Sequence, residues 1–338
     1  MMSENILTVK DLKTYFYTAS GIAKAVDGVS FNIAKGETMG IVGESGSGKS
    51  VTSSSIIRLL PPRTGKIVGG SIEFEGKDVL ALSKKELNDF RGKDIAVIFQ
   101  DPMTSLDPVF KIGKQMTEMI MAHQNVTKDE AWKMAVEALS KVGIPEPEKR
   151  MNSYPYELSG GMCQRVIIAM AVCCKPKLII ADEPTTALDV TVQAQVLELL
   201  KELQRDMDTA ILLITHNLGV VWEMCDKVMV MYAGNTVEFT DTKTLYSNPR
   251  HPYTWGLLDS MPKLSDESKG ELKTIPGTPP DLRLTGECCN FYNRCPYVTE
   301  ACTQSVPPLV EVEPGHFVAC HRQNLTNKLE KGEGLKDE

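Results

Sequence analysis

The stretch GESGSGKS (43–50) decides the fold class of this chain. It follows ETMGIV (37–42), an apolar run typical of a buried strand, and precedes VTSSSIIRLL (51–60), which can form a helix. Glycines at these positions let the backbone curl, so that successive N–H groups point toward one anion. A loop of this form between a strand and a helix predicts a phosphate-binding loop.

The residue types in this loop also predict how a nucleotide is held. The positive end of the following helix favours phosphate, and Lys49 is long enough to reach the β and γ phosphates. The Ser50 hydroxyl is a suitable Mg²⁺ ligand. The alternative is an ordinary turn rich in glycine and serine, which the match at every fixed position disfavours. We expect ATP and Mg²⁺ here, contacted by Gly43, Ser45, Gly46, Ser47, Gly48, Lys49, Ser50 and Val51.

Further apolar runs alternate with a helical pattern along the first 240 residues. Buried strands are predicted at 95–99 (IAVIF), 178–181 (LIIA) and 210–215 (AILLIT), because short continuous apolar runs suit a sheet covered on both faces. Between the last two, apolar residues at helical spacing predict a helix that Asp189 caps. Strand, helix and strand in this order predict a parallel sheet in an α/β fold.

The segment 110–158 reads differently, as mostly helical. Thr127 and Glu130 have the spacing of a capping box. The alanines that follow at helical spacing predict a helix that ends at Gly143. We therefore interpret this part of the chain as a helical insertion between two strand-rich segments.

Length and composition limit the remaining possibilities. A chain of 338 residues suggests about two domains. We expect a nucleotide-binding domain over 1–240, with the helical insertion at about 105–165, and a C-terminal extension rich in proline and cysteine over 241–338. A net charge of −7 argues against a nucleic-acid partner held by phosphate contacts. The sequence shows no signal peptide and no apolar run long enough to span a membrane, so we expect a cytoplasmic protein.

Two acidic residues, Asp182 and Glu183, follow directly after the apolar run 178–181. Taken alone, they would read equally well as solvated acids at a strand end. In a chain with a phosphate loop, Asp182 is predicted to hold the Mg²⁺ shell. Glu183 is then placed to orient or deprotonate the water that attacks the phosphate.

The stretch LSGGMCQR (158–165) carries a family resemblance. It resembles the signature of ATP-binding-cassette (ABC) ATPases, some 20 residues before the acidic strand end. Gln100, at the end of the run 95–99, resembles the glutamine of that family's Q-loop. ALD (187–189) resembles the D-loop, and His216 resembles the switch histidine.

The resemblance implies a RecA-like P-loop ATPase core with a helical subdomain, active as a dimer with two ATP molecules between its subunits. Ser159, Gly160 and Gly161 would face the γ-phosphate held by the opposite subunit. Gln100 would contact Mg²⁺ or the attacking water, and His216 the γ-phosphate. The predicted catalytic residues are Lys49, Gln100, Glu183 and His216, and the predicted Mg²⁺ ligands are Ser50, Gln100 and Asp182.

An aromatic ring stacks on adenine in this family. Phe16 lies at about the family's spacing for that ring, and its neighbours Tyr15 and Tyr17 are alternatives. The sequence leaves open which of the three stacks on the base.

Other stretches narrow the resemblance to one subfamily. FQDPMTSLDP (99–108), NPRHPYT (248–254) and the Cys-bearing end resemble the ATPases of oligopeptide, dipeptide and nickel importers, so the match runs over about 5–323. It implies a subunit on the cytoplasmic face of the membrane that energises uptake of di- or oligopeptides. Its partners would be transmembrane permease subunits, a second ATPase subunit and indirectly an external solute-binding protein. Related importers often pair two different ATPase subunits, so a paralogue is expected, and the sequence leaves open whether the second subunit is instead another copy of this chain. The alternatives are a nickel importer, a soluble ABC ATPase outside transport, and a regulatory module that binds ATP without turnover.

The C-terminal end holds five of the nine cysteines, including Cys288. Cys289, Cys295, Cys302 and Cys320 can supply four thiolates to a metal centre. Zinc sites usually pair their thiols more closely than this spacing does. The resemblance implies a 4Fe–4S cluster on these four, with zinc or unligated thiols as alternatives, and Cys288 as a substitute for Cys289.

Overall fold

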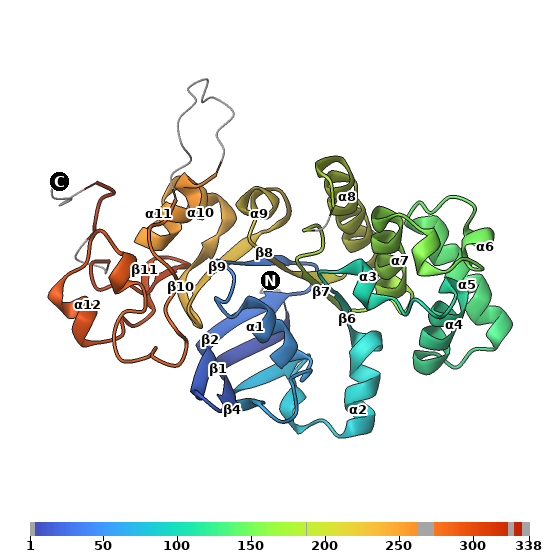
Figure 1. The fold of residues 1–338 in the computed structure, drawn as a ribbon, viewed down its shortest axis with the longest axis horizontal. Helices are drawn as coiled ribbons and strands as arrows, with labels where there is room; N and C mark the ends of the chain where they lie inside the picture. Colours follow the sequence, from blue (N-terminus) through green and yellow to red (C-terminus); the bar gives the residue numbers. More distant parts are fainter. Residues whose placement is uncertain (1–3, 187, 262–273, 324–327, 333–338) are drawn as a thin grey trace. The chain divides into compact units, whose positions relative to one another are not determined.

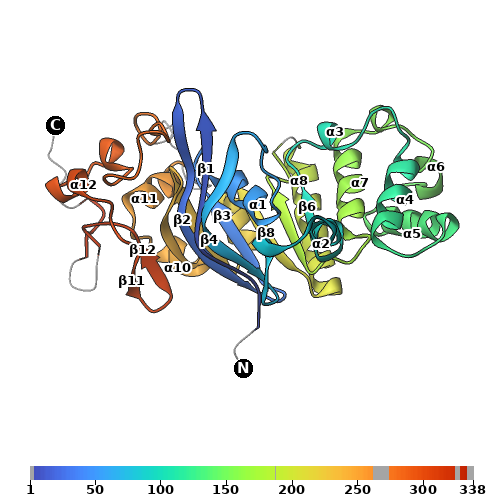
Figure 2. The same ribbon diagram turned by 90° about the horizontal axis from the view of Figure 1, so that it is seen from below.

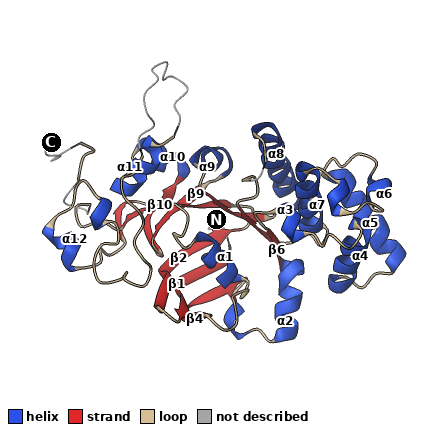
Figure 3. Cartoon of the chain, in the orientation of Figure 1, coloured by secondary structure: helices blue, strands red, loops and turns tan. Residues whose placement is uncertain are grey.

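The computed structural model describes residues 4–186, 188–261, 274–323 and 328–332. The chain forms two compact units that interleave in the sequence. The first unit comprises residues 1–6, 33–38 and 75–214, and the second comprises residues 7–32, 39–74 and 215–338. Each unit combines helices and strands (Figure 3).

The first unit contains a parallel sheet made of three apolar strands: β6 (Ile95–Ile98), β7 (Leu178–Asp182) and β8 (Ala210–Thr215). Leu178 of β7 pairs with Ile95 of β6 and with Ala210 of β8. Most of their side chains are buried. The predicted parallel pairing of these strands is confirmed.

The helices of the first unit begin where the sequence predicts. Asp189 caps α8 (Val190–Met207), since its carboxylate accepts a hydrogen bond from the Val192 N–H at 3.0 Å. Thr127 and Glu130 form the predicted capping box of α5 (Lys128–Lys141). α5 packs against α4 (Ile112–His123) and α7 (Gly160–Val172), as Figure 1 shows. The shorter elements are β5 (Lys77–Asp78), α2 (Lys84–Asp89), α3 (Pro102–Ser105) and α6 (Pro147–Arg150).

The second unit contains two sets of strands. In one, β1 (Asn5–Thr18) lies between β2 (Gly21–Ala34) and β4 (Gly65–Phe74) and runs antiparallel to β4 (Figure 2). The other set has the order β11-β12-β10-β9-β3, in which β3 and β9 are parallel and the other neighbours antiparallel. Its strands are β3 (Thr38–Val42), β9 (Lys227–Tyr232), β10 (Asn235–Asp241), β11 (Val310–Glu313) and β12 (His316–Val318).

The first helix of the second unit, α1 (Lys49–Ile56), is shorter than the run 51–60 allows. Arg58 adopts the left-handed conformation with φ of 53°, which breaks the helical repeat. The other helices are α9 (Leu218–Met224), α10 (Thr242–Ser247), α11 (Pro252–Asp259) and α12 (Glu300–Gln304). Among the described helices, none combines the length and apolar character that a membrane crossing needs.

Candidate functional site

The glycines of the loop 43–50 have conformations that other residues rarely adopt. Gly43, Gly46 and Gly48 have φ of 153°, 78° and 105°. A Cβ atom on Gly43 would lie 2.2 Å from the Met231 carbonyl oxygen, and one on Gly48 would lie 2.3 Å from that of Ala25. Backbone conformation and packing therefore both require glycine at Gly43 and Gly48.

Lys49 turns its ammonium group back into the curl of this loop. Its Nζ donates hydrogen bonds to the carbonyl oxygens of Gly43 at 2.7 Å and Glu44 at 3.0 Å. The Ser47 hydroxyl is buried, and no hydrogen-bond partner for it occurs within the described ranges. Ser50 and Val51 form the first turn of α1. A curled backbone, a buried ammonium group and an unsatisfied hydroxyl fit a bound phosphate group.

In the first unit, the acidic pair lies at the end of β7. Asp182 is the last residue of the strand and is partly exposed, unlike the four before it. Glu183 has a φ of 49°, an uncommon value for a residue with a side chain, and its N–H donates to the Ile214 carbonyl oxygen at 2.8 Å. The backbone bond to β8 helps to hold Glu183 in this conformation.

The Glu183 carboxylate is the centre of a small hydrogen-bond network. Its Oε2 accepts from Gln100 Nε2 at 2.8 Å and from Thr186 Oγ1 at 2.9 Å. Two predicted catalytic residues, 83 positions apart, therefore meet. Thr186 was missed by the sequence reasoning, and its only signal is its place three residues after Glu183.

The signature residues lie at the start of α7. Ser159 is the N-cap, and its Oγ accepts a hydrogen bond from the Met162 N–H at 3.3 Å. A Cβ atom on Gly160 would meet nothing within 4 Å, whereas one on Gly161 would lie 2.9 Å from Val192 Cγ1. The open space at Gly160 leaves this helix start accessible, as an anion site requires.

The remaining predicted site residues lie in the second unit or in the D-loop. His216 directly follows β8 and is exposed. Phe16 is half-buried, and a Cβ atom on Gly65 would lie 3.1 Å from its ring. Tyr15 donates its hydroxyl to Asp27 at 2.8 Å, and burial together with this carboxylate raises the pKa of Tyr15 to about 12. In the predicted D-loop (187–189), Ala187 lies outside the described residues. The catalytic and ligand roles of all these residues stay predictions.

The C-terminal tail, defined here as residues 274–323, brings four thiols together. Burial and the neighbouring thiolates raise the pKa of Cys289 to about 11 and that of Cys295 to about 12. Burial also raises the pKa of Cys320, and Cys302 adds to the shift. The four thiols lie close enough for the charge of one to affect the pKa of another, and this holds for every pair among Cys289, Cys295, Cys302 and Cys320.

The geometry does not support a metal centre on these thiols. Across the described ranges, no group of three or more His, Cys, Asp or Glu side chains is arranged to hold a metal ion. The residue types suit iron–sulfur ligation, but their arrangement does not support it, and the cluster stays a prediction.

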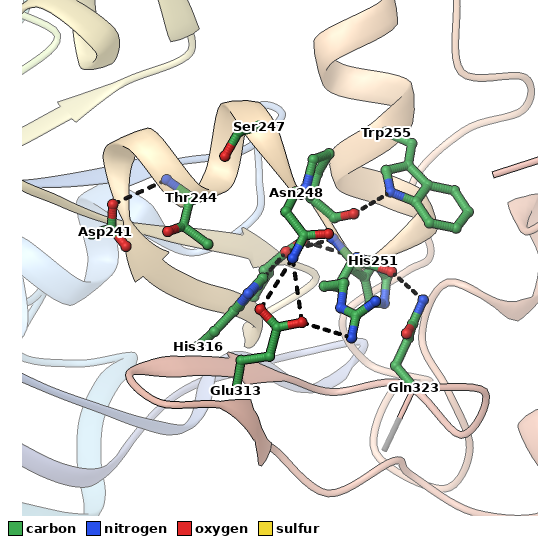
Figure 4. Close-up of polar contacts among 12 residues, drawn as sticks. Asp241, Thr244, Ser247, Asn248, His251, Trp255, Glu313, His316 and Gln323 are labelled. Carbon is green, nitrogen blue, oxygen red and sulfur yellow. Dashed lines mark hydrogen bonds and ion pairs between the residues drawn. The ribbon is translucent and has the colours of Figure 1, made fainter. Parts of the chain in front are cut away.

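A buried polar network joins the tail to β10. The Glu238 carboxylate, fully buried, accepts from the backbone N–H groups of Arg250 at 2.7 Å and His251 at 2.9 Å. His316 Nε2 of β12 lies 2.8 Å from the same carboxylate. Figure 4 shows an adjoining contact, in which Glu313 of β11 accepts a hydrogen bond from Asn248. Glu313 also forms an ion pair with Arg250, at 3.1 Å. This network fixes the segment that carries the run 248–254 against the tail.

Comparison with known proteins agrees with these features. A family model described as "ABC transporter" matches residues 26–186, and one described as "Oligopeptide/dipeptide transporter, C-terminal region" matches residues 237–302. The oligopeptide transport ATP-binding protein OppD of Bacillus subtilis is 54% identical over 93% of this chain and 87% of that protein. OppD of Escherichia coli is 51% identical over 95% of this chain and 94% of that protein. The dipeptide transport ATP-binding protein DppD of Bacillus subtilis is 50% identical over 95% of this chain and 96% of that protein.

Solved structures show the same cassette fold. The dimeric ATP-binding cassette MJ0796, in a post-hydrolysis state with ADP and Pi, is 27% identical with a TM-score of 0.63, over 70% of this chain and 98% of that chain. The structure of cbiO1 from Clostridium perfringens is 29% identical with a TM-score of 0.61, over 73% of this chain and 92% of that chain. The chain is therefore an ABC ATPase with a RecA-like α/β core. It belongs to the ABC transporter ATP-binding proteins that carry the oligopeptide/dipeptide transporter C-terminal region.

Proposed function

We propose that this chain hydrolyses ATP to energise the uptake of oligopeptides or dipeptides through a membrane permease. The observation that carries this proposal is the 54% identity to an oligopeptide transport ATP-binding protein, which spans both the cassette and the C-terminal region. A soluble ABC ATPase outside transport would not be expected to share that C-terminal region. A module that binds ATP without turnover would have no need for Glu183 and its network.

We assign the chemistry of these residues from the motifs in which they lie. Lys49 and the loop N–H groups bind the phosphates, and the Ser50 hydroxyl, Gln100 and Asp182 are the proposed ligands of Mg²⁺. The ion, when bound, neutralises charge that develops on the phosphate oxygens. Glu183 accepts the proton of the attacking water, while Gln100 and Thr186 hold its carboxylate in place. His216 contacts the γ-phosphate in this assignment.

Transport requires partners that this chain alone does not supply. We propose that residues 1–240 form the nucleotide-binding domain, which closes on a second ATPase subunit, a paralogue, with ATP between them. Ser159, Gly160 and Gly161 then face the ATP of the partner. The dimeric form of MJ0796, a cassette with the same fold, supports such a pairing. The pair docks on permease subunits at the cytoplasmic face of the membrane, and an external binding protein delivers the peptide. Because ATP favours the closed state of the two ATPase subunits, their closure supplies the work of transport.

Reconstitution tests this function directly. The chain, co-purified with its membrane subunits and placed in liposomes with the binding protein, is expected to accumulate labelled peptide only when ATP is present. Uptake of Ni²⁺ without peptide uptake would instead identify a nickel importer. ATP hydrolysis by an isolated soluble chain that never associates with membrane subunits would contradict a role in transport.

We also propose an iron–sulfur cluster on the four tail thiols, which their residue type and the family resemblance support. We expect the chain, purified without oxygen, to contain iron and acid-labile sulfide and to absorb near 400 nm. Cys302→Ser should lose most of both, whereas Cys163→Ser, which alters a buried cysteine of the cassette, should keep them. Stoichiometric zinc in a colourless sample, or no metal at all, would contradict the cluster.

A further inference from the structure

Arg294, in the C-terminal tail, donates five hydrogen bonds from its guanidinium group. A guanidinium group has five N–H donors. Its two Nη atoms form a bidentate pair with the Glu44 carboxylate, at 2.6 and 3.0 Å. Its other donors reach the Tyr232 hydroxyl at 3.3 Å and the carbonyl oxygens of Pro276 at 2.8 Å and Ile275 at 3.2 Å. With a side chain only 4% exposed, Arg294 is fully committed to this arrangement.

Glu44 is the second residue of the phosphate loop, and it is held at three points. Arg294 holds its carboxylate, and its backbone N–H donates to the Tyr253 hydroxyl at 2.8 Å. Its carbonyl oxygen accepts from Lys49 Nζ at 3.0 Å. The N–H of Glu44 therefore faces Tyr253 rather than the inside of the loop. The orientation of this residue fixes where the loop begins to curl around Lys49.

The tail reaches the loop by a second route as well. Asn290 Nδ2 donates to Asn235 Oδ1 at 2.7 Å and to the Ala233 carbonyl oxygen at 3.3 Å, in the turn between β9 and β10. In the same turn, the Gly234 N–H donates to the Ser47 carbonyl oxygen at 2.9 Å. The tail segment 290–294 thus contacts the loop directly at its start and indirectly at Ser47.

We propose that Arg294 is a positioning residue for the phosphate loop, so that the C-terminal tail sets the affinity of this chain for ATP through Glu44. The proposal rests on the proposed function in one respect, namely that the loop binds ATP. The charges of Glu44 and Arg294 support the proposal independently of their geometry. A carboxylate beside the loop repels a nucleotide triphosphate unless a cation neutralises it, and Arg294 is that cation.

The chemistry of the pair makes the arginine specific. Lysine has three donors and no planar fork, so Arg294→Lys keeps the charge but not the bidentate geometry. Removing one partner of a pair this buried leaves the other poorly compensated. Arg294→Gln should therefore free Glu44 both to move and to repel phosphate. We expect it to raise the dissociation constant and the KM for ATP about tenfold, an effect of about 1.4 kcal/mol, while kcat changes much less.

The test measures ATP binding by titration calorimetry and steady-state hydrolysis on the full chain. The variants are Arg294→Gln, Arg294→Lys, Glu44→Gln and the double variant Arg294→Gln/Glu44→Gln. Arg250→Gln is the matched control, because Arg250 is equally buried, at 6% exposed, and pairs with a tail carboxylate, Glu313, away from the loop. Thermal unfolding of each variant is recorded in parallel.

We expect Arg294→Lys to bind ATP with intermediate affinity and the double variant to bind no more weakly than Arg294→Gln alone. Arg250→Gln should lower the unfolding temperature and leave ATP affinity unchanged. Equal ATP affinity in Arg294→Gln and the unaltered chain, with only a lower unfolding temperature, would overturn the proposal. Additive losses in the double variant would also overturn it. If the unaltered chain itself fails to bind ATP, the proposed function fails instead.

Discussion

Replacing Glu183 with glutamine is expected to lower ATP turnover at least about 100-fold while ATP binding persists, because a positioned general base contributes about 10²–10⁴ to the rate. Glutamine keeps an oxygen that can accept the hydrogen bonds of Gln100 and Thr186, which lie 2.8 and 2.9 Å from the Glu183 carboxylate. It cannot accept a proton from water. The variant should therefore keep the local structure and lose the chemistry alone.

Phosphate release at saturating ATP measures the turnover of this variant, and size-exclusion chromatography with ATP measures whether it stays associated with a second ATPase subunit. Glu202→Gln, an exposed acidic residue of α8, is the control and should retain full activity. Unchanged hydrolysis in Glu183→Gln would remove Glu183 from the mechanism. Loss of ATP binding would show that the substitution disturbed more than the base.

Glu238→Gln is expected to destabilise the folded chain by about 3 kcal/mol, because it leaves buried donors without a carboxylate. Both carboxylate oxygens accept hydrogen bonds, from Arg250 N–H and from His251 N–H, and His316 Nε2 lies 2.8 Å from one of them. Glutamine turns one of these acceptors into a donor. An amide nitrogen would then face an N–H group or the imidazole at hydrogen-bond distance.

His251 gives this network a second constraint. Burial lowers the pKa of His251 to about 4, so the ring is neutral near pH 7 and its Nδ1 accepts from the Tyr253 N–H at 3.1 Å. Glu238→Gln is therefore not compensated by a charge on this histidine. Urea unfolding measures the loss, with Glu313→Gln, a carboxylate that is 43% exposed, as the control. Similar stability of both variants would contradict the role of the buried carboxylate.

The sequence predicts the local features of this fold well, because they depend on neighbouring residues. Continuous apolar runs predict β6, β7 and β8, and the caps at Thr127 and Asp189 follow from side chains that act within three residues. The end of α1 was not evident, because the left-handed conformation of Arg58 follows from its surroundings and not from a glycine.

Local sequence patterns do not identify contacts between residues that are distant in the chain. Gln100 and Glu183 were placed in one site only through the family resemblance, and their hydrogen bond agrees with it. The pair of Arg294 and Glu44 joins residues 250 positions apart. A single charged residue carries no periodicity or spacing that would identify such a partner. The four tail thiols were singled out by their spacing, which cannot say whether their arrangement suits a ligand.

The pairing of β12 on β10 has a consequence for how the chain is made. Glu238 of β10 is opposite Val318 of β12, so the strand that covers this side of β10 is synthesised some 80 residues later. During translation, β10 leaves the ribosome with a side of unpaired backbone groups and a carboxylate whose partner His316 does not yet exist. Exposed strand edges pair readily with other chains. A product cut short before His316 should therefore aggregate more readily than the full chain.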